Sequence, residues 1–308
     1  MATPDAYVGE YTYSIIPSTF AQSLPSTDPL SFDYTTNNFG LIAPPGSQGA
    51  GSSSVTSQWQ QLEQRLHDLN ASAPQGTSYK LLYLARHGQG THNLASAHYG
   101  TAVWESHIGR QVSDPIFGNL VDPLLTPVGV AQVERARDFF LRALPQGLPV
   151  PDVWYVSPLN RCLSTARITW APLLEKGVLK EWKPVVKENI REILGVNTCD
   201  KRSTVSSLRP RYPEMQFETG MSEQDELWQA DYRETFDEVD VRVRKIMDFI
   251  WDKKQQVVSI TSHSCWTRGA LRVLGHREYK VQTGEVLPVL VKGSKDVDPF
   301  SVSDSGYL

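Results

Sequence analysis

Arg86 and His87 stand side by side directly after an apolar run, and together they could bind and attack a phosphate group. The run 80–85 is typical of a buried strand, and Gly88 and Gly90 permit a tight turn after it. An arginine suits phosphate because its guanidinium donates parallel hydrogen bonds to two oxygens and stays charged. A neutral imidazole can attack phosphorus, because histidine titrates nearest to neutral pH. Open α/β sheets place their sites at the carboxyl ends of strands, so this turn is a candidate anion site.

Two further strand ends carry side chains of the same kind. Arg161 follows the apolar run 153–156 and falls in the first turn of a predicted helix, where free backbone N–H groups favour an anion. His263 follows the apolar run 256–261 in the same way. Taken alone, Arg161 fits a surface ion pair and His263 fits a hydrogen-bonded structural residue. Three such strand ends at one edge of one sheet instead predict a single shared site.

The elements that must position these side chains alternate between strand and helix along the chain. Such alternation predicts an α/β fold with three layers, in which a mainly parallel sheet has helices on both faces. The strand runs are apolar throughout, as expected for strands that are buried on both faces. The predicted strands are 80–85, 153–156, 184–187, 256–261 and 286–291, and the predicted helices are 59–66, 126–143, 158–175, 226–252 and 264–274.

The first 56 residues differ in composition from the rest of the chain, because they are rich in Ser, Thr, Pro and Gly. The stretch 44–54 predicts a flexible linker, whereas 32–34 and 39–42 carry enough apolar side chains to dock on a core. We therefore expect a partly flexible N-terminal extension over 1–56 that is docked on the core, and one main domain over 57–308.

The bulk composition predicts an ordinary cytoplasmic protein. The net charge of −4 gives no general attraction to nucleic acid or to an anionic membrane, and no apolar run is long enough for a membrane span. The N-terminus lacks the basic and apolar regions of a secretory signal. Three cysteines, Cys162, Cys199 and Cys265, cannot form a disulfide framework and lack metal-ligand spacing, so a reducing compartment is expected.

Several short motifs, and their order along the chain, resemble the histidine phosphatase superfamily in its phosphoglycerate-mutase-like branch. Three further stretches, 86–93, 197–202 and 275–280, are similar to the fungal phosphomutase-like proteins. The resemblance covers roughly residues 30 to 293. The motifs are Arg86-His87-Gly88 with Asn93, Leu125-Thr126 with Gly129 and Gln132, Ser157-Pro158 with Arg161, Thr165 and Ala166, and Ser262-His263.

The resemblance implies a role for each of the main site residues. His87 would attack phosphorus and form a phosphohistidine that water then hydrolyses, with His263 as a further catalytic residue. Arg86, Arg161 and His263 would surround the phosphoryl group and offset the charge on its oxygens, and Asn93 would add a neutral donor. The family's fold carries a small cap insert, here at about 195–225, and its chemistry needs no metal and no cofactor.

The leaving oxygen needs a proton, and Glu192 matches the position of the family's acid. The acid-phosphatase branch has its acid directly after the second histidine, where this chain has Ser264. An ion pair with Arg191 or Arg161 is the structural alternative for Glu192. Reserve candidates for the acid are Glu188, Glu223 and Asp225.

Substrate contacts beyond the phosphate are expected from the cap insert. Arg202 belongs to a basic run with Lys201, Arg209 and Arg211 and could bind a second anionic group, and Glu223 could reach in from the following loop. The structural alternative for the basic run is a solvated face.

We therefore expect a phosphatase that hydrolyses a phosphorylated small-molecule metabolite through phosphohistidine. A phosphomutase of the same fold and a non-catalytic phosphate-binding protein are the alternatives. The expected partner is the small phosphorylated substrate alone, without nucleic acid or membrane, and the oligomeric state is left open.

Overall fold

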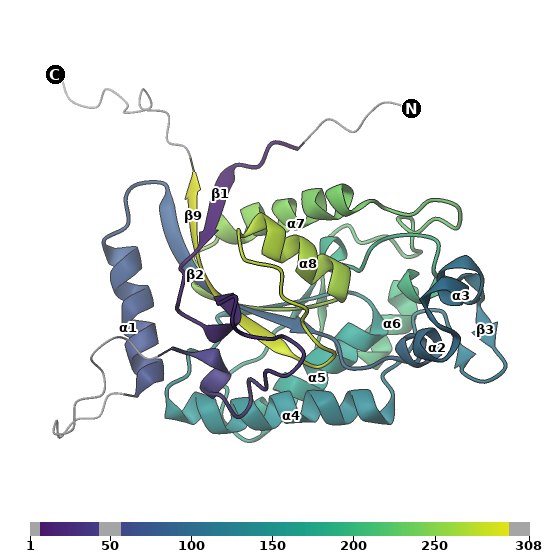
Figure 1. Ribbon diagram of the computed structural model, residues 1–308, viewed down its shortest axis with the longest axis horizontal. Helices are drawn as coiled ribbons and strands as arrows, with labels where there is room; N and C mark the ends of the chain where they lie inside the picture. Colours follow the sequence, from purple (N-terminus) through teal and green to yellow (C-terminus); the bar gives the residue numbers. More distant parts are fainter. Residues whose placement is uncertain (1–6, 43–56, 296–308) are drawn as a thin grey trace.

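The computed structural model describes residues 7–42 and 57–295, and its centre is a seven-stranded sheet between two layers of helices (Figure 1). The strands lie in the order β1-β9-β2-β8-β5-β6-β7. Neighbours from β2 to β7 are parallel, whereas β9 is antiparallel to both β2 and β1. The predicted fold class is confirmed. The strands are β1 Tyr11–Ile15, β2 Thr77–Arg86, β5 Val153–Val156, β6 Val185–Val186, β7 Gln216–Phe217, β8 Val257–Ser262 and β9 Val286–Lys295.

The helices cover the sheet in two groups. On one face α1 (Gln58–Ala71), α4 (Pro127–Ala143) and α5 (Asn160–Glu175) share an apolar cluster with the strands. On the other face α7 (Phe236–Trp251) and α8 (Ser264–Val273) pack against each other and bury a second cluster. In Figure 1, α4 and α5 lie below the sheet, α1 lies at its left, and α7 and α8 lie above it. Both faces of the sheet are thus covered, which is why the central parts of β2, β5, β8 and β9 are mainly apolar.

The register of the sheet brings the predicted site residues to one edge. In β2 and β8, Arg86 is paired with Ser262, so the turns that follow the two strands leave the sheet side by side. The neighbouring strand β5 ends at Val156, which is paired with Thr261 of β8. The carboxyl ends of three adjacent parallel strands therefore meet, as the sequence predicted.

Helix α7 begins later than predicted. The expected helix over 226–252 is wrong in its first part, because the helix starts at Phe236. Thr235 and Glu238 form a capping box: the Thr235 hydroxyl accepts a hydrogen bond from the Glu238 N–H, and the Glu238 carboxylate accepts one from the Thr235 N–H. This box defines the helix start and leaves 226–235 as irregular chain at the site edge.

The described part of the N-terminal segment lies on the core. β1 adds an edge strand beside β9, although no strand was predicted there. Asp248 of α7 accepts hydrogen bonds from the hydroxyls of Tyr7 and Tyr13, and Phe39 is fully buried among aromatic side chains. The predicted linker at 44–54 lies outside the described residues.

The predicted cap insert contains the short helix α6 (Val205–Arg211) and the strand β7, which extends the sheet next to β6. Beyond the end of β2, α2 (Thr91–Tyr99) and α3 (Thr101–Ser106) lie at the same side of the molecule, with the small hairpin of β3 (Ser113–Asp114) and β4 (Gly118–Asn119) (Figure 1). Within the described ranges no helix is both long and apolar enough to cross a membrane.

Candidate active site

A pocket of about 210 Å³ lies at the carboxyl edge of the sheet, and we call it the phosphate pocket. Arg86, His87 and Arg161 line it, and the ring of His263 lies behind it with its centroid 5.0 Å from that of His87. Asn93 and Glu192 line it as well. The structure therefore brings together the side chains that the sequence predicted from separate strand ends, with Asn93 and Glu192 beside them.

His87 presents one free ring nitrogen. Its Nδ1 lies 2.7 Å from the carbonyl oxygen of Gly88. A carbonyl can only accept, so Nδ1 carries the proton and Nε2 keeps its lone pair. Burial, with the charges of Arg161 and Arg86, lowers the pKa of His87 well below its usual range. The imidazole is therefore neutral at neutral pH, as a nucleophile must be.

Gly88 is needed for the backbone turn that holds this histidine. A Cβ at Gly88 would lie 2.4 Å from the carbonyl oxygen of Gly129 in the first turn of α4. No side chain fits into so short a gap, so the turn can pack against α4 only with glycine at this position. The Gly88 N–H also donates to the hydroxyl of Thr165 in α5, 3.1 Å away. Helices on one face of the sheet thus fix the nucleophile.

Arg86 and Arg161, the two pocket arginines that the sequence predicted, differ in how many of their donors are used. Arg161 is fully buried, and its guanidinium donates to His263 Nδ1, to the Cys199 carbonyl and to Asp200 at 3.2, 2.6 and 2.9 Å. Arg86 donates from Nη1 to the Val281 carbonyl at 3.0 Å, and its buried Nε finds no acceptor within the described residues. Arg86 thus keeps donors for a ligand in the pocket.

His263 orients Arg161. Because its Nδ1 accepts from the Arg161 Nε–H, its Nε2 carries the proton and donates to the Ser157 hydroxyl, 2.7 Å away. Burial and the charge of Arg161 lower the pKa of His263 well below its usual range, so the ring is neutral. Both ring nitrogens have protein partners in this arrangement, so a direct contact of His263 with phosphate stays a prediction.

Glu192 faces the pocket without a cationic partner. One carboxylate oxygen accepts from the backbone N–H groups of Cys265 and Ile193, and the other accepts from the Ser264 hydroxyl at 2.9 Å. Within the described residues Glu192 forms no ion pair, although it is close enough to Arg86 for an electrostatic attraction between them. The ion-pair alternative for Glu192 is therefore not what the structure contains. The carboxyl group is held by neutral donors at the start of α8, at the pocket wall.

Arg202 does not reach the pocket, and its expected contact with a second anionic group is wrong for this arrangement. Its side chain is fully buried beneath the insert, and its Nε lies 2.7 Å from the Glu188 carboxylate in an ion pair that lacks hydrogen-bond geometry. Its Nη1 and Nη2 donate to the backbone carbonyls of Ser203, Glu223, Ser222 and Gln224. Arg202 therefore holds the insert together.

Glu223 and the reserve acids are likewise turned away from the phosphate pocket. The Glu223 carboxylate accepts from the Ser206 hydroxyl and N–H at the start of α6, outside the pocket. Glu188 and Asp225 both pair with Arg191, Asp225 through two bonds of 2.7 and 2.5 Å. Among the carboxylates that the sequence offered as the acid, Glu192 is the one that lines the pocket.

The sequence reasoning missed four of the charged or histidine residues that line the phosphate pocket. They are Asp200, Arg233, Glu105 and His92. Asp200 lies between two cations, 2.9 Å from Arg161 and 3.6 Å from Arg233, and burial raises its pKa to about 6 although Arg161 opposes the shift. Arg233 lies in the stretch that was predicted as helix. The only signal for Asp200 was its place in the stretch 197–202. The sequence analysis used that stretch for the family resemblance and assigned no role to Asp200.

A bend in the chain places Asp200 at the pocket. Gly195 and Val196 both have left-handed backbone, with φ of 87° and 64°. A Cβ at Gly195 would lie 1.8 Å from the Tyr232 carbonyl oxygen, so only glycine fits there. Such a conformation is costly for a β-branched valine, and the bend directs 197–200 into the pocket.

Within the described residues no group of three or more His, Cys, Asp or Glu could hold a metal ion.

Comparison with known proteins finds both a family and individual relatives. Residues 82–283 match the family described as the histidine phosphatase superfamily (branch 1). A probable phosphoglycerate mutase of Arthroderma benhamiae is 37% identical over 292 residues, which cover 93% of this chain and 86% of the relative. A probable phosphoglycerate mutase of Saccharomyces cerevisiae is 34% identical over 249 residues, covering 75% of this chain and 82% of the relative.

Among solved structures, a phosphoglycerate mutase from Bacillus anthracis overlaps 70% of this chain and 89% of its own, with 13% identity and a TM-score of 0.44. That likeness is too loose to bear on the chemistry.

Proposed function

Because this chain belongs to the histidine phosphatase superfamily, we propose that it is a phosphatase that hydrolyses a phosphorylated small molecule through phosphohistidine. The observation that carries the proposal is the free Nε2 of the neutral, buried His87 in a pocket lined by Arg86, Arg161 and Glu192. The nucleophile, the cations and the acid thus lie in one pocket. The proposed reaction uses these side chains and no metal.

The first step transfers the phosphoryl group to the protein. His87 Nε2 forms a bond to phosphorus while the bond from phosphorus to the leaving oxygen breaks. Arg86 and Arg161 offset the charge on the phosphoryl oxygens, which is the main contribution that a protein makes to phosphoryl transfer. The leaving oxygen takes a proton from Glu192 and departs as an alcohol.

The second step reverses the role of Glu192. Its carboxylate takes a proton from a water molecule, whose oxygen bonds to phosphorus while the bond to His87 Nε2 breaks. Inorganic phosphate leaves, and Glu192 is again protonated for the next cycle. This step needs water at the pocket. Of the predicted insert, Asn197, Cys199 and Asp200 line the pocket, whereas residues 201–225 do not.

A phosphomutase is the second candidate, and the names of the relatives favour it. Both fungal relatives are called probable phosphoglycerate mutases. A mutase would use the same His87 and return the phosphoryl group to a substrate hydroxyl instead of to water. The two activities share the first step and differ only in which acceptor reaches phosphohistidine.

The test follows phosphate release and isomer formation in the same reaction. We expect inorganic phosphate to appear from p-nitrophenyl phosphate and from a panel of phosphorylated metabolites, including 3-phosphoglycerate. In His87→Ala the rate should fall by about 10⁴-fold or more, because the covalent path is lost. A labelled phosphoryl group, stable in base and labile in acid, should be found on wild-type protein and be missing from the variant.

His67→Ala is the matched control, because His67 is an exposed histidine on α1. It should keep both the rate and the label. Isomerisation of 3-phosphoglycerate without phosphate release would favour the mutase. Phosphate binding with no label and no turnover would favour a non-catalytic protein.

A further inference from the structure

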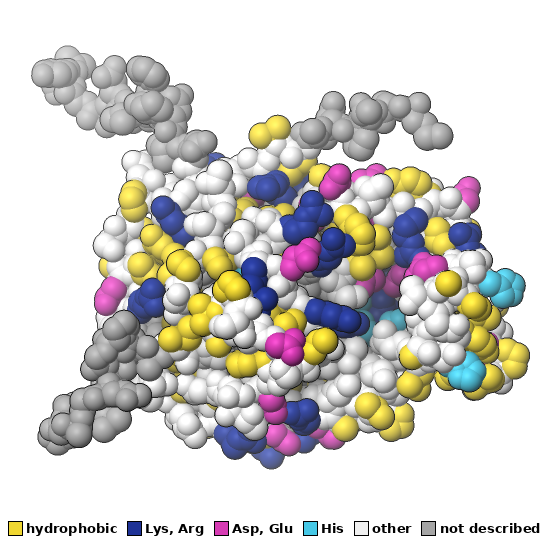
Figure 2. Space-filling view, in the orientation of Figure 1, with side chains coloured by type: hydrophobic (Ala, Val, Ile, Leu, Met, Phe, Trp, Pro, Cys, Tyr) yellow, Lys and Arg dark blue, Asp and Glu magenta, His cyan; other side chains and the backbone are white. Residues whose placement is uncertain are grey.

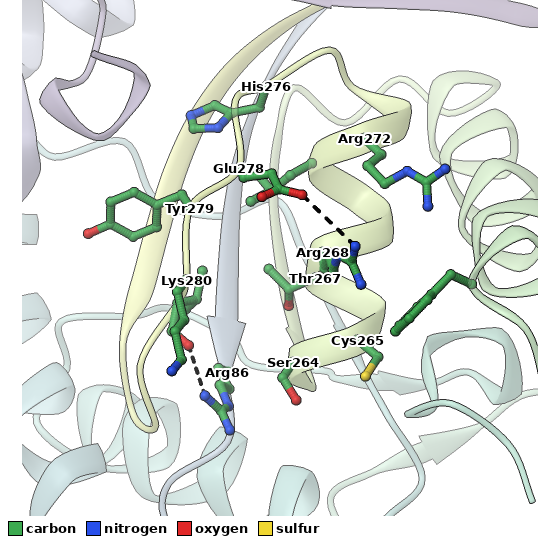
Figure 3. Close-up of a pocket in the computed structure, with 13 residues that line it drawn as sticks. Arg86, Ser264, Cys265, Thr267, Arg268, Arg272, His276, Glu278, Tyr279 and Lys280 are labelled. Carbon is green, nitrogen blue, oxygen red and sulfur yellow. Dashed lines mark hydrogen bonds and ion pairs between the residues drawn. The ribbon is translucent and has the colours of Figure 1, made fainter. Parts of the chain in front are cut away.

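A second pocket of about 340 Å³ adjoins the phosphate pocket, and we call it the side pocket (Figure 3). It lies between α8 and the segment 276–281 that leads from α8 toward β9. Arg86, Ser264 and Cys265 line both pockets. Its volume is in the range of pockets that enclose small organic molecules.

The shared wall carries the group that must meet the leaving oxygen. The Glu192 carboxylate accepts hydrogen bonds from the Ser264 hydroxyl and the Cys265 N–H, both residues of this wall. In the proposed reaction the leaving oxygen lies opposite the attacking His87 Nε2 and within reach of Glu192. The carbon skeleton attached to that oxygen therefore points from the phosphate pocket into the side pocket.

The inner wall of the side pocket is mainly apolar. Leu271 of α8 is buried in the floor, and the segment opposite contributes Val281 and the ring of Tyr279. Phe236, the first residue of α7, covers one side with a ring that is 42% exposed. An apolar wall of this kind gains free energy by removing apolar ligand surface from water, and a small polyhydroxy acid has little such surface to remove.

Cations stand at the rim of the same pocket. Arg268 lies over the Phe236 ring at 4.3 Å and is 3.9 Å from the Glu278 carboxylate. Arg272 pairs with Asp240, and the exposed Lys280 forms no ion pair within the described residues. Figure 2 shows Lys and Arg side chains gathered on this face, around a hollow in which histidine side chains are visible. Such exposed charges would draw an anionic phosphoester toward the opening.

We propose that the side pocket binds the alcohol part of the substrate, and that this part is an apolar group of about the size of an aromatic ring. The inference rests on the proposed phosphoryl transfer at His87 and names the substrate class for it. Specificity would then come from α8, the segment 276–281 and Phe236, while the insert would take no part in it.

The test compares two phosphomonoesters of primary alcohols that differ in their apolar part, 2-phenylethyl phosphate and ethyl phosphate. We expect kcat/KM for the phenyl ester to be about 10- to 100-fold higher, from burial of the ring. Phe236→Ala should reduce this preference by about tenfold, through a loss of kcat/KM for the phenyl ester. Remaining His87-dependent turnover of ethyl phosphate reports that the variant is folded, and Phe236 follows the helix cap without being part of it.

Leu227→Ala is the matched control, because Leu227 is 44% exposed and lies outside the side pocket. It should keep the full preference. If wild type hydrolyses both esters equally in a His87-dependent way, the side-pocket inference is overturned while the phosphatase stands. The same holds if Phe236→Ala keeps the preference. If neither ester releases phosphate or labels His87, the proposed function fails, and the inference fails with it.

Discussion

Two groups of buried charged side chains lie close together in this protein and are built in opposite ways. In the phosphate pocket, the Arg86 guanidinium makes one hydrogen bond to the Val281 carbonyl and leaves its buried Nε without an acceptor in the described structure. Beneath the insert, Arg202 donates four hydrogen bonds to backbone carbonyls and forms an ion pair with the Glu188 carboxylate. We call Arg191, Arg202, Glu188 and Asp225 the insert ion-pair cluster.

The difference separates structural charge from charge that is kept for a ligand. A buried ion with all its bonds made is stable only as part of its cluster, and removing one partner leaves an uncompensated charge. A buried ion with free donors has a desolvation cost that a bound anion can offset. Arg86 and Arg202 have the same chemistry, and only the count of their bonds assigns one to the site and the other to the scaffold.

The first prediction concerns the carboxylates, which also fall into one group at the phosphate pocket and one group in the insert ion-pair cluster. Glu192 is held by neutral donors, whereas Glu188 pairs with Arg191 and Arg202. Glu192→Gln should lower kcat for an alkyl phosphate by about 10²- to 10⁴-fold, because the leaving oxygen loses its proton donor. The loss should be much smaller for p-nitrophenyl phosphate, whose leaving group needs no proton.

A series of esters with leaving groups of different pKa measures this, since the slope of log kcat against leaving-group pKa should steepen in Glu192→Gln. Glu188→Gln is the control and should keep the wild-type slope. An equal loss for all esters in Glu192→Gln would mean that this carboxyl group is not the acid.

The next effect compares the two arginines directly. Arg86→Lys should lower kcat/KM by about 10²-fold, because an ammonium cannot replace the forked donors that face the phosphoryl oxygens. Arg202→Lys should keep kcat within about threefold and lose roughly 3 kcal/mol of unfolding free energy, because several of its buried acceptors are left unbonded. Urea unfolding and steady-state kinetics on both variants give the two readouts. A loss of activity in Arg202→Lys with unchanged stability would contradict the structural role that the comparison assigns to Arg202.

The sequence predicted the parts of the site that depend on strand ends. Each of these residues lies at or just after the end of a short apolar run, which can be recognised from the neighbouring sequence alone. They are Arg86, His87, Arg161 and His263. Their common edge then follows from the topology of a parallel sheet. The start of α4 was equally local, because Thr126 caps it and Pro127 takes its first position.

What the sequence could not predict depends on partners that are distant along the chain. The basic residues of the 201–211 run suggested an anion site, but the bonds that occupy Arg202 come from 188 and from backbone carbonyls at 203 and 222–224. β1 is an edge strand that pairs with β9, and its five residues alternate between half-buried aromatic or aliphatic side chains and exposed polar ones, a period-two pattern that the sequence analysis did not use. The predicted helix 226–252 extended before Phe236 across a stretch that the Thr235 capping box excludes.

The smallest expected effect is a pH dependence of stability that differs in sign between the two regions. Glu285, next to Arg86, is buried, and its carboxylate accepts from the Tyr279 hydroxyl and the Gln282 N–H. Burial raises the pKa of Glu285 to about 7, so the folded protein holds this proton more tightly than the unfolded chain. In the insert ion-pair cluster, burial would raise the pKa of Asp225, but the bonds and charge of Arg191 outweigh it and lower that pKa.

The stability that Glu285 contributes is therefore fully present below its unfolded pKa of about 4.5 and is lost as pH rises through about 7. That of Asp225 is present above its unfolded pKa and is lost as pH falls. Relative to Glu285→Gln, wild type should lose roughly 3 kcal/mol between about pH 4.5 and pH 8, because glutamine does not titrate. Urea unfolding of both proteins across this range measures the difference, with the exposed Glu278→Gln as control. A difference that stays constant with pH would show that the pKa of Glu285 is the same in the folded and unfolded protein, and that burial does not raise it.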